Sequence, residues 1–78
     1  MSDMSAEVLM TPLNSSHVVA AGFDKDTGTL VVEFKGGKEY AWSGVSEADY
    51  KALLSAPSPG KHMRYVIEER FGKGRPVA

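Results

Sequence analysis

The sequence predicts an α+β domain in which a three-stranded antiparallel β-meander is followed by two α-helices packed on one face of the sheet. Three observations lead to this prediction. Three short runs rich in β-branched and aromatic residues come first, and turn-forming residues separate them. Two segments with helix-start signals and apolar residues at helical spacing follow. The length of 78 residues suits one small domain.

The strands are expected in "HVVAAGF", "TLVVEF" and "KEYAWS". The first connection, residues 25–28, fits a four-residue loop that ends on Gly28, where glycine supplies a positive φ. Asp24 precedes this loop and can cap the turn with its side chain. A loop of this length places Phe23 opposite Leu30.

The second connection, "FKGGK", decides which side chains share a face, because a shift of one residue moves a whole strand's side chains to the other face. A two-residue turn at the paired glycines would put Trp42 on the face opposite Leu30. A three-residue loop over residues 35–37 would pair the two instead. We predict this second register because it buries the most apolar area. It gathers on one face Val19, Ala21, Phe23, Leu30, Val32, Phe34, Tyr40 and Trp42.

The two helices are marked by their first residues. Ser46 is the expected N-cap of the first helix, and Asp49 three residues later completes a weaker form of the capping box. Ser58 caps the second helix with Pro59 at its first position, and Gly72 ends it. The apolar stripes that need the sheet are Tyr50, Leu53 and Leu54 in the first helix and Met63, Ile67 and Phe71 in the second.

The chain is expected to divide into a flexible leader (residues 1–12), a folded domain (13–72) and a flexible basic tail (73–78). Its composition, with 42% hydrophobic and 24% charged residues and a net charge of −1, is that of a soluble globular protein. The absence of cysteine excludes disulfides, thiol nucleophiles and cysteine-ligated zinc. No apolar run approaches the roughly 20 residues of a membrane span, and no signal peptide is evident, so we expect a cytoplasmic protein without a membrane partner.

The same order of elements carries a family resemblance. The matching pieces, between Ser15 and Phe71, are "SSHV", "GFD", "LVVEF", a glycine followed by "YAW" and "GV", Tyr50 and Leu53, "APSPGKHM" and "IEERF". Together they resemble the KTSC domain, a short module named for its occurrence at the C-terminus of some lysyl-tRNA synthetases and also found alone in small bacterial and phage proteins. The chain departs from the family at His17, where asparagine is more frequent, and near Arg64. The resemblance implies a fold and no particular activity.

No combination of side chains predicts catalysis. Ser15, Ser16 and His17 could suggest a nucleophile with a base, but neighbours on an extended chain point to opposite sides. The two serines are instead expected to satisfy backbone groups where the leader enters the sheet. His17 and His62 are the only histidines, and without cysteine they make no metal site. We therefore expect no enzyme, no catalytic residue, no metal and no cofactor.

The stretch "SPGKHMR" is the strongest candidate for a binding site. It brings free backbone N–H groups and a cation to a helix start, an arrangement that suits phosphate or carboxylate, although the spacing is not that of a P-loop. The alternative is that Ser58 is only an N-cap and Lys61 is solvated. The candidate ligand-binding residues are Ser58, Gly60, Lys61, Arg64, Ser15 and Ser16. The C-terminal third is also locally basic, and Arg70, Lys73 and Arg75 could extend the site to a nucleic acid.

Three functions remain open. The first is a non-enzymatic module that binds RNA or DNA through the start of the second helix and the basic tail, encouraged by the family's attachment to a tRNA synthetase. The second is a binder of a small phosphorylated or nucleotide-like ligand, which could lie between protomers of a homo-oligomer. The third is a protein-interaction module that uses the other sheet face. That face is expected to carry Val18, Ala20, Val31 and Ala41.

Overall fold

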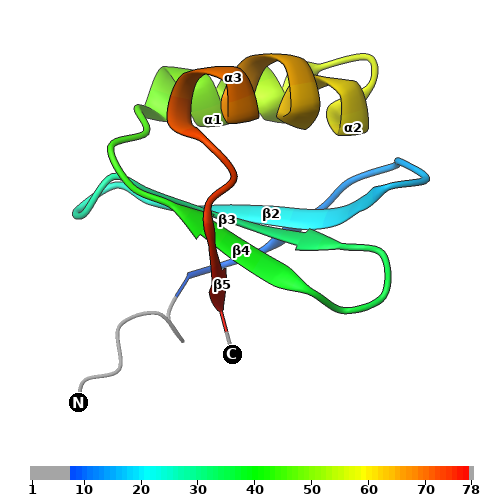
Figure 1. The fold of residues 1–78 in the computed structure, drawn as a ribbon, viewed down its shortest axis with the longest axis horizontal. Helices are drawn as coiled ribbons and strands as arrows, with labels where there is room; N and C mark the ends of the chain where they lie inside the picture. Colours follow the sequence, from blue (N-terminus) through cyan, green and yellow to red (C-terminus); the bar gives the residue numbers. More distant parts are fainter. Residues whose placement is uncertain (1–7, 78) are drawn as a thin grey trace.

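The computed structural model describes residues 8–77 as a five-stranded antiparallel sheet with both helical segments on one of its faces (Figure 1). The strands lie in sequence order: β1 Thr11–Pro12, β2 Val18–Asp24, β3 Thr29–Phe34, β4 Glu39–Trp42 and β5 Arg75–Val77. The prediction of an α+β fold with helices on one face is confirmed. The number of strands was wrong, since the expected meander forms only the central three strands.

The two additional strands lie at the edges of the sheet, in segments expected to be leader and tail. β1 pairs with β2, and β5 pairs with β4. Both are very short and contain a proline, Pro12 or Pro76, which lacks an N–H group and is therefore tolerated at a sheet edge. Strands of two and three residues have no hydrophobic period that sequence analysis can detect. Residues 1–7 of the expected leader lie outside the described residues.

The predicted loops and register of the meander are confirmed. Phe23 pairs with Leu30, and Leu30 pairs with Trp42. The N–H of Gly28 donates to the carbonyl of Asp24 at 2.8 Å, which closes the four-residue loop. The second loop covers residues 35–37, and both of its glycines have positive φ values. Glycine at these positions therefore allows the register that places Trp42 in the core.

The expected position of Val19 in the core was wrong. Val18 is fully buried, whereas Val19 is 42% exposed. The pairing of β2 with β3 shifts between Val18 and Ala20, so that Val18 pairs with Phe34 and Ala20 with Glu33. Such a bulge inserts one extra residue and reverses the faces of the residues before it.

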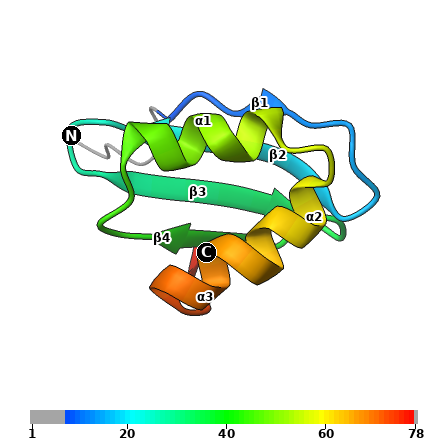
Figure 2. The same cartoon turned by 90° about the horizontal axis from the view of Figure 1, so that it is seen from above.

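The helices begin and end near their predicted residues. α1 spans Glu47–Ser55 after a capping box formed by Ser46 and Asp49. The second helical segment runs without interruption through α2 (Pro59–His62), a π-helical turn (Met63–Ile67) and α3 (Glu68–Phe71). The π-helical turn was not predicted. Figure 2, seen from the helix side, shows α1 and this second segment lying side by side over the sheet.

The core lies between the helices and the sheet. Its buried residues are Val18, Ala21, Leu30, Val32, Trp42, Val45, Leu53, Met63 and Ile67. The polar edge of Trp42 is satisfied, because its indole N–H donates to the carbonyl of Gly72 at 2.8 Å. The core therefore reaches as far as the end of α3 and fixes the direction in which the chain leaves for β5.

The small residues expected on the free face of the sheet do not form an exposed patch. Val18 faces the helices, and Ala20, Val31 and Ala41 are buried. Gly22 lies so close to residues 8–10 that an added Cβ would be 2.6 Å from the side chain of Val8. Residues 8–10 therefore cover part of this face.

Candidate functional site

A hollow of about 720 Å³ lies where three segments of the chain meet at the start of the second helical segment. The segments are the turn before β2, the end of β3 and the helical residues between Ser58 and Glu68, with Lys73 beside them. All six sequence-predicted ligand-binding residues line it: Ser15, Ser16, Ser58, Gly60, Lys61 and Arg64. The structure thus brings together two stretches that are more than 40 residues apart in the sequence.

The turn before β2 is held by Ser15. Its hydroxyl oxygen accepts hydrogen bonds from the N–H groups of His17 at 3.1 Å and Val18 at 3.3 Å. The carbonyl of His17 in turn accepts a bond from the N–H of Lys35 at 3.0 Å, which ties the turn to the end of β3. Ser15 therefore has the structural role that the sequence predicted for both serines. Ser16 is exposed and lines the hollow without a hydrogen bond among those that the structure gives.

Gly60 allows the helix to approach this turn. A Cβ added at Gly60 would lie 3.1 Å from the Cβ of His17, closer than most real contacts, and 4.0 Å from the Ser15 hydroxyl oxygen. A side chain at this position would push the two walls of the hollow apart. Gly60 thus allows the two walls of the hollow to lie close together and adds no side chain of its own.

The start of the helix offers fewer free N–H groups than the sequence suggested. The hydroxyl oxygen of Ser58 accepts from the N–H of Lys61 at 3.5 Å, and its carbonyl accepts from the N–H of His62 at 2.9 Å. Pro59 has no N–H to offer. Ser58 is therefore an N-cap, as the structural interpretation of this stretch proposed, and the positive charge at the hollow comes mainly from cationic side chains.

Four cationic side chains line the hollow, namely Lys35, Lys61, Arg64 and Lys73. All four are exposed, and among residues 8–77 the only acidic residue that lines the hollow is Glu68. The ion pairs within residues 8–77 are Lys51–Glu47 and Arg70–Asp49, so none of the four cations has a carboxylate partner there. The hollow therefore carries excess positive charge on a chain whose net charge is −1.

Tyr65 is a site residue that the sequence analysis missed. Tyr65 is 64% exposed and lines the same hollow as the four cations. Lys61, Tyr65 and Glu68 follow one another at spacings of four and three residues, with Arg64 beside them, which places this group on one face of a helix. This spacing is the feature of the sequence from which Tyr65 could have been predicted. The π-helical turn that carries Tyr65 is a feature frequently found at functional sites.

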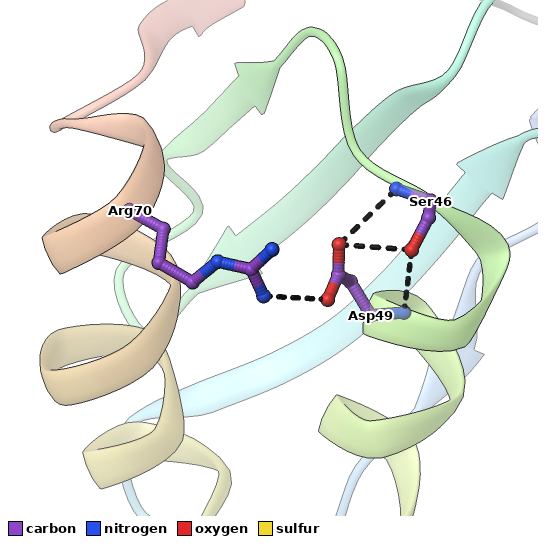
Figure 3. A network of polar contacts seen from close by, with 3 residues as sticks. All are labelled: Ser46, Asp49 and Arg70. Carbon is purple, nitrogen blue, oxygen red and sulfur yellow. Dashed lines mark hydrogen bonds and ion pairs between the residues drawn. The ribbon is translucent and has the colours of Figure 1, made fainter.

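Two of the three expected tail cations lie outside the hollow. The guanidinium of Arg70 pairs with the carboxylate of Asp49 at 2.8 Å and thus links α3 to the first turn of α1 (Figure 3). Arg75, which lies on β5, donates a hydrogen bond to the hydroxyl of Ser43 at 2.9 Å. Only Lys73 reaches the hollow.

Two ionisable groups outside the hollow, Asp49 and His62, have shifted pKa values. Burial raises the pKa of Asp49, but hydrogen bonds from Ser46 and the ion pair with Arg70 outweigh it, so the pKa lies below its ordinary value. Burial lowers the pKa of His62, and the negative charge of Asp49 opposes this shift. His62 does not line the hollow. Within residues 8–77 no three metal-ligating side chains cluster, and no helix there is long and apolar enough to cross a membrane.

Comparison with known proteins finds one family and several relatives. The KTSC domain family model matches residues 14–71. A protein of Tsukamurella paurometabola is 34% identical over 62 residues, which is 80% of this chain and 92% of the relative. A protein of Stutzerimonas stutzeri is 36% identical over 56 residues, covering 72% of this chain and 79% of the relative. The crystal structure of a KTSC domain protein from Yersinia pestis superimposes with a TM-score of 0.81 at 29% identity, covering 91% of this chain and 99% of that one.

Proposed function

The chain belongs to the KTSC domain family, and we propose that this member is a non-enzymatic module that binds RNA or DNA through the cationic hollow. One observation carries the proposal. Four cations without carboxylate partners in residues 8–77 converge from separate segments on a hollow that also contains an exposed tyrosine. Lysine and arginine contacts to phosphates supply most of the affinity for nucleic acid, and aromatic rings can bind bases.

The distribution of charge supports a polyanion as the partner. A chain with a net charge of −1 has no general attraction for phosphate, so binding requires cations concentrated at one place. Lys35 and Lys73 come from outside the helix and widen the cationic surface beyond Lys61 and Arg64. A surface of this extent can contact more than one phosphate of a strand.

A small phosphorylated or nucleotide-like ligand is the second candidate, favoured by the size of the hollow. Its volume of about 720 Å³ lies within the usual range of small-molecule pockets. Two measurements distinguish the candidates. Affinity for nucleic acid should rise from a mononucleotide to an oligonucleotide and fall steeply with added salt, by about 0.7 logarithmic units per tenfold increase in salt for each phosphate contact of a single strand. If the site instead binds a small phosphorylated ligand, an oligonucleotide should bind no more tightly than a mononucleotide.

The proposal is tested by reversing the charge of two cations. The double variant Lys61→Glu with Arg64→Glu should abolish binding of a fluorescently labelled oligonucleotide in anisotropy titrations, because it replaces attraction of phosphate by repulsion. Both residues are exposed, so circular dichroism and the melting temperature should remain close to wild type.

The matched control is Lys25→Glu with Lys51→Glu. It changes the net charge equally at two exposed lysines that do not line the hollow. This control should retain most of the affinity. Retained binding in the Lys61 and Arg64 variant, or equal loss in both variants, would contradict a site at the hollow.

A further inference from the structure

We infer that the hollow binds one unpaired nucleotide of a single strand, with its base against the ring of Tyr65, so that the protein prefers single-stranded nucleic acid to duplex. This inference rests on the proposed function and specifies its substrate class. It starts from an aromatic residue, Tyr65, that is 64% exposed at a cationic hollow.

The ring of Tyr65 has no aromatic partner within residues 8–77. Aromatic contacts there join Phe23 with Tyr50 and connect Phe34, Tyr40 and Trp42 among themselves. Tyr65 belongs to neither group, and the core of the domain forms without it. The exposed ring can therefore be covered by a ligand, and a nucleobase offers the flat apolar face that stacks on it.

The neighbours of Tyr65 match the other parts of a nucleotide. Arg64 is adjacent, and Lys61 lies one helical turn earlier on the same face, so both are placed for the phosphate beside a stacked base. Glu68 lies one turn after Tyr65 and also lines the hollow. Its carboxylate would repel a phosphate, whereas it can accept a hydrogen bond from a base amino group. The Glu68 end of the hollow therefore suits the base and the Lys61 end suits the backbone.

A duplex cannot use this arrangement fully. Its bases are paired and stacked on each other, and bringing one into a pocket costs unstacking and unpairing free energy. Duplex phosphates can still contact the exposed lysines at the rim. Removing the ring should therefore weaken binding of a single strand and leave the weaker binding of a duplex unchanged.

The experiment compares a 12-nucleotide single strand of mixed sequence with its duplex, each titrated against the wild-type protein, Tyr65→Ala and Tyr65→Phe. We expect wild type to bind the single strand more tightly. Tyr65→Ala should weaken single-strand binding roughly 5- to 150-fold, the usual effect of removing one base-stacking ring. Tyr65→Phe keeps the ring and should retain most of the affinity. Val19→Ala removes exposed apolar surface at a residue that does not line the hollow and is the control.

The outcomes separate this inference from the proposed function. If both nucleic acids bind, require Lys61 and Arg64, and are equally affected by Tyr65→Ala or not affected at all, the single-strand inference is wrong and the nucleic-acid proposal stands. If the wild-type protein binds neither, both are wrong. Because Tyr65 is largely exposed, the melting temperature of Tyr65→Ala should match wild type, and this check assigns any loss of binding to the ring.

Discussion

At the scale of single residues, Trp42 combines burial in the core with a hydrogen bond to the backbone. It is 2% exposed, pairs with Leu30 across the sheet, and donates its indole N–H to Gly72. We expect Trp42→Ala to lower the free energy of unfolding by about 3–5 kcal/mol, the usual cost of emptying a core aromatic site. Urea denaturation measures this loss, with Tyr65→Ala as the exposed aromatic control. A Trp42→Ala protein as stable as wild type would contradict its position in the core.

The two serines before β2 show what residue type alone can predict. The sequence suggested one role for both, since serine hydroxyls commonly bond nearby backbone groups. Within residues 8–77 only Ser15 does so, and its hydroxyl oxygen accepts from the N–H groups of His17 and Val18. Ser16 and Tyr65 are exposed at the hollow, and their orientation depends on the turn and on the helix rather than on residue type.

At the scale of elements, local sequence signals predicted the loops and the helix ends. They did not predict the β-bulge or the π-helical turn. Gly28, the capping box at Ser46 and the stop at Gly72 act within a few residues of themselves, and all three were predicted correctly. The bulge at Val19 and the π-helical turn each depend on one residue of extra length that tertiary packing selects. Strands and helices are predicted from apolar residues that recur every two or every 3.6 residues, and this recurrence does not reveal one inserted residue.

The second helical segment also contains a group that should make stability depend on pH. The Nε2 atom of His62 is buried without a hydrogen-bond partner in the described residues, and burial lowers the pKa of this histidine below its ordinary value of 6.5. The unfolded chain therefore binds a proton more readily than the folded one as the pH falls through 6.5. Stability should decrease from there down to the lower folded pKa.

This expectation is checked by melting the protein between pH 7.5 and pH 5.5. The wild-type melting temperature should fall over this range, and His62→Gln should reduce the dependence. Exposed His17 supplies the control, because His17→Gln should leave the wild-type trend in place. If His62→Gln follows the same curve as wild type, another group is responsible for the trend.

At the scale of the whole molecule, the sequence singled out many of the residues that line the hollow, but it also included residues that lie outside it. It placed six residues in one site, and the fold brings all six to the hollow. It also grouped Arg70, Lys73 and Arg75, although two of these have partners elsewhere. Asp49 lies 21 residues from Arg70, and Ser43 lies 32 residues from Arg75. Partners so distant in sequence are set by tertiary packing, which charge patterning cannot detect.

The C-terminal residues are accordingly part of the fold as well as a source of charge. Gly74 has a φ of 75°, and an added Cβ would lie 2.6 Å from the Trp42 ring, so the backbone lies directly against the indole. β5 then pairs with β4. Truncation after Gly72 removes this cover and the pairing together.

We expect this truncation to lower the free energy of unfolding by about 1–3 kcal/mol in urea denaturation, within the range typical of lost packing. The double variant Lys73→Ala with Arg75→Ala separates the two roles, because it removes both charges and keeps the backbone of β5. It should weaken nucleic-acid binding through Lys73 and cost less stability than the truncation. If the truncated protein unfolds at the wild-type urea concentration, the C-terminal residues act only through charge, and the contact of Gly74 with Trp42 contributes nothing to stability.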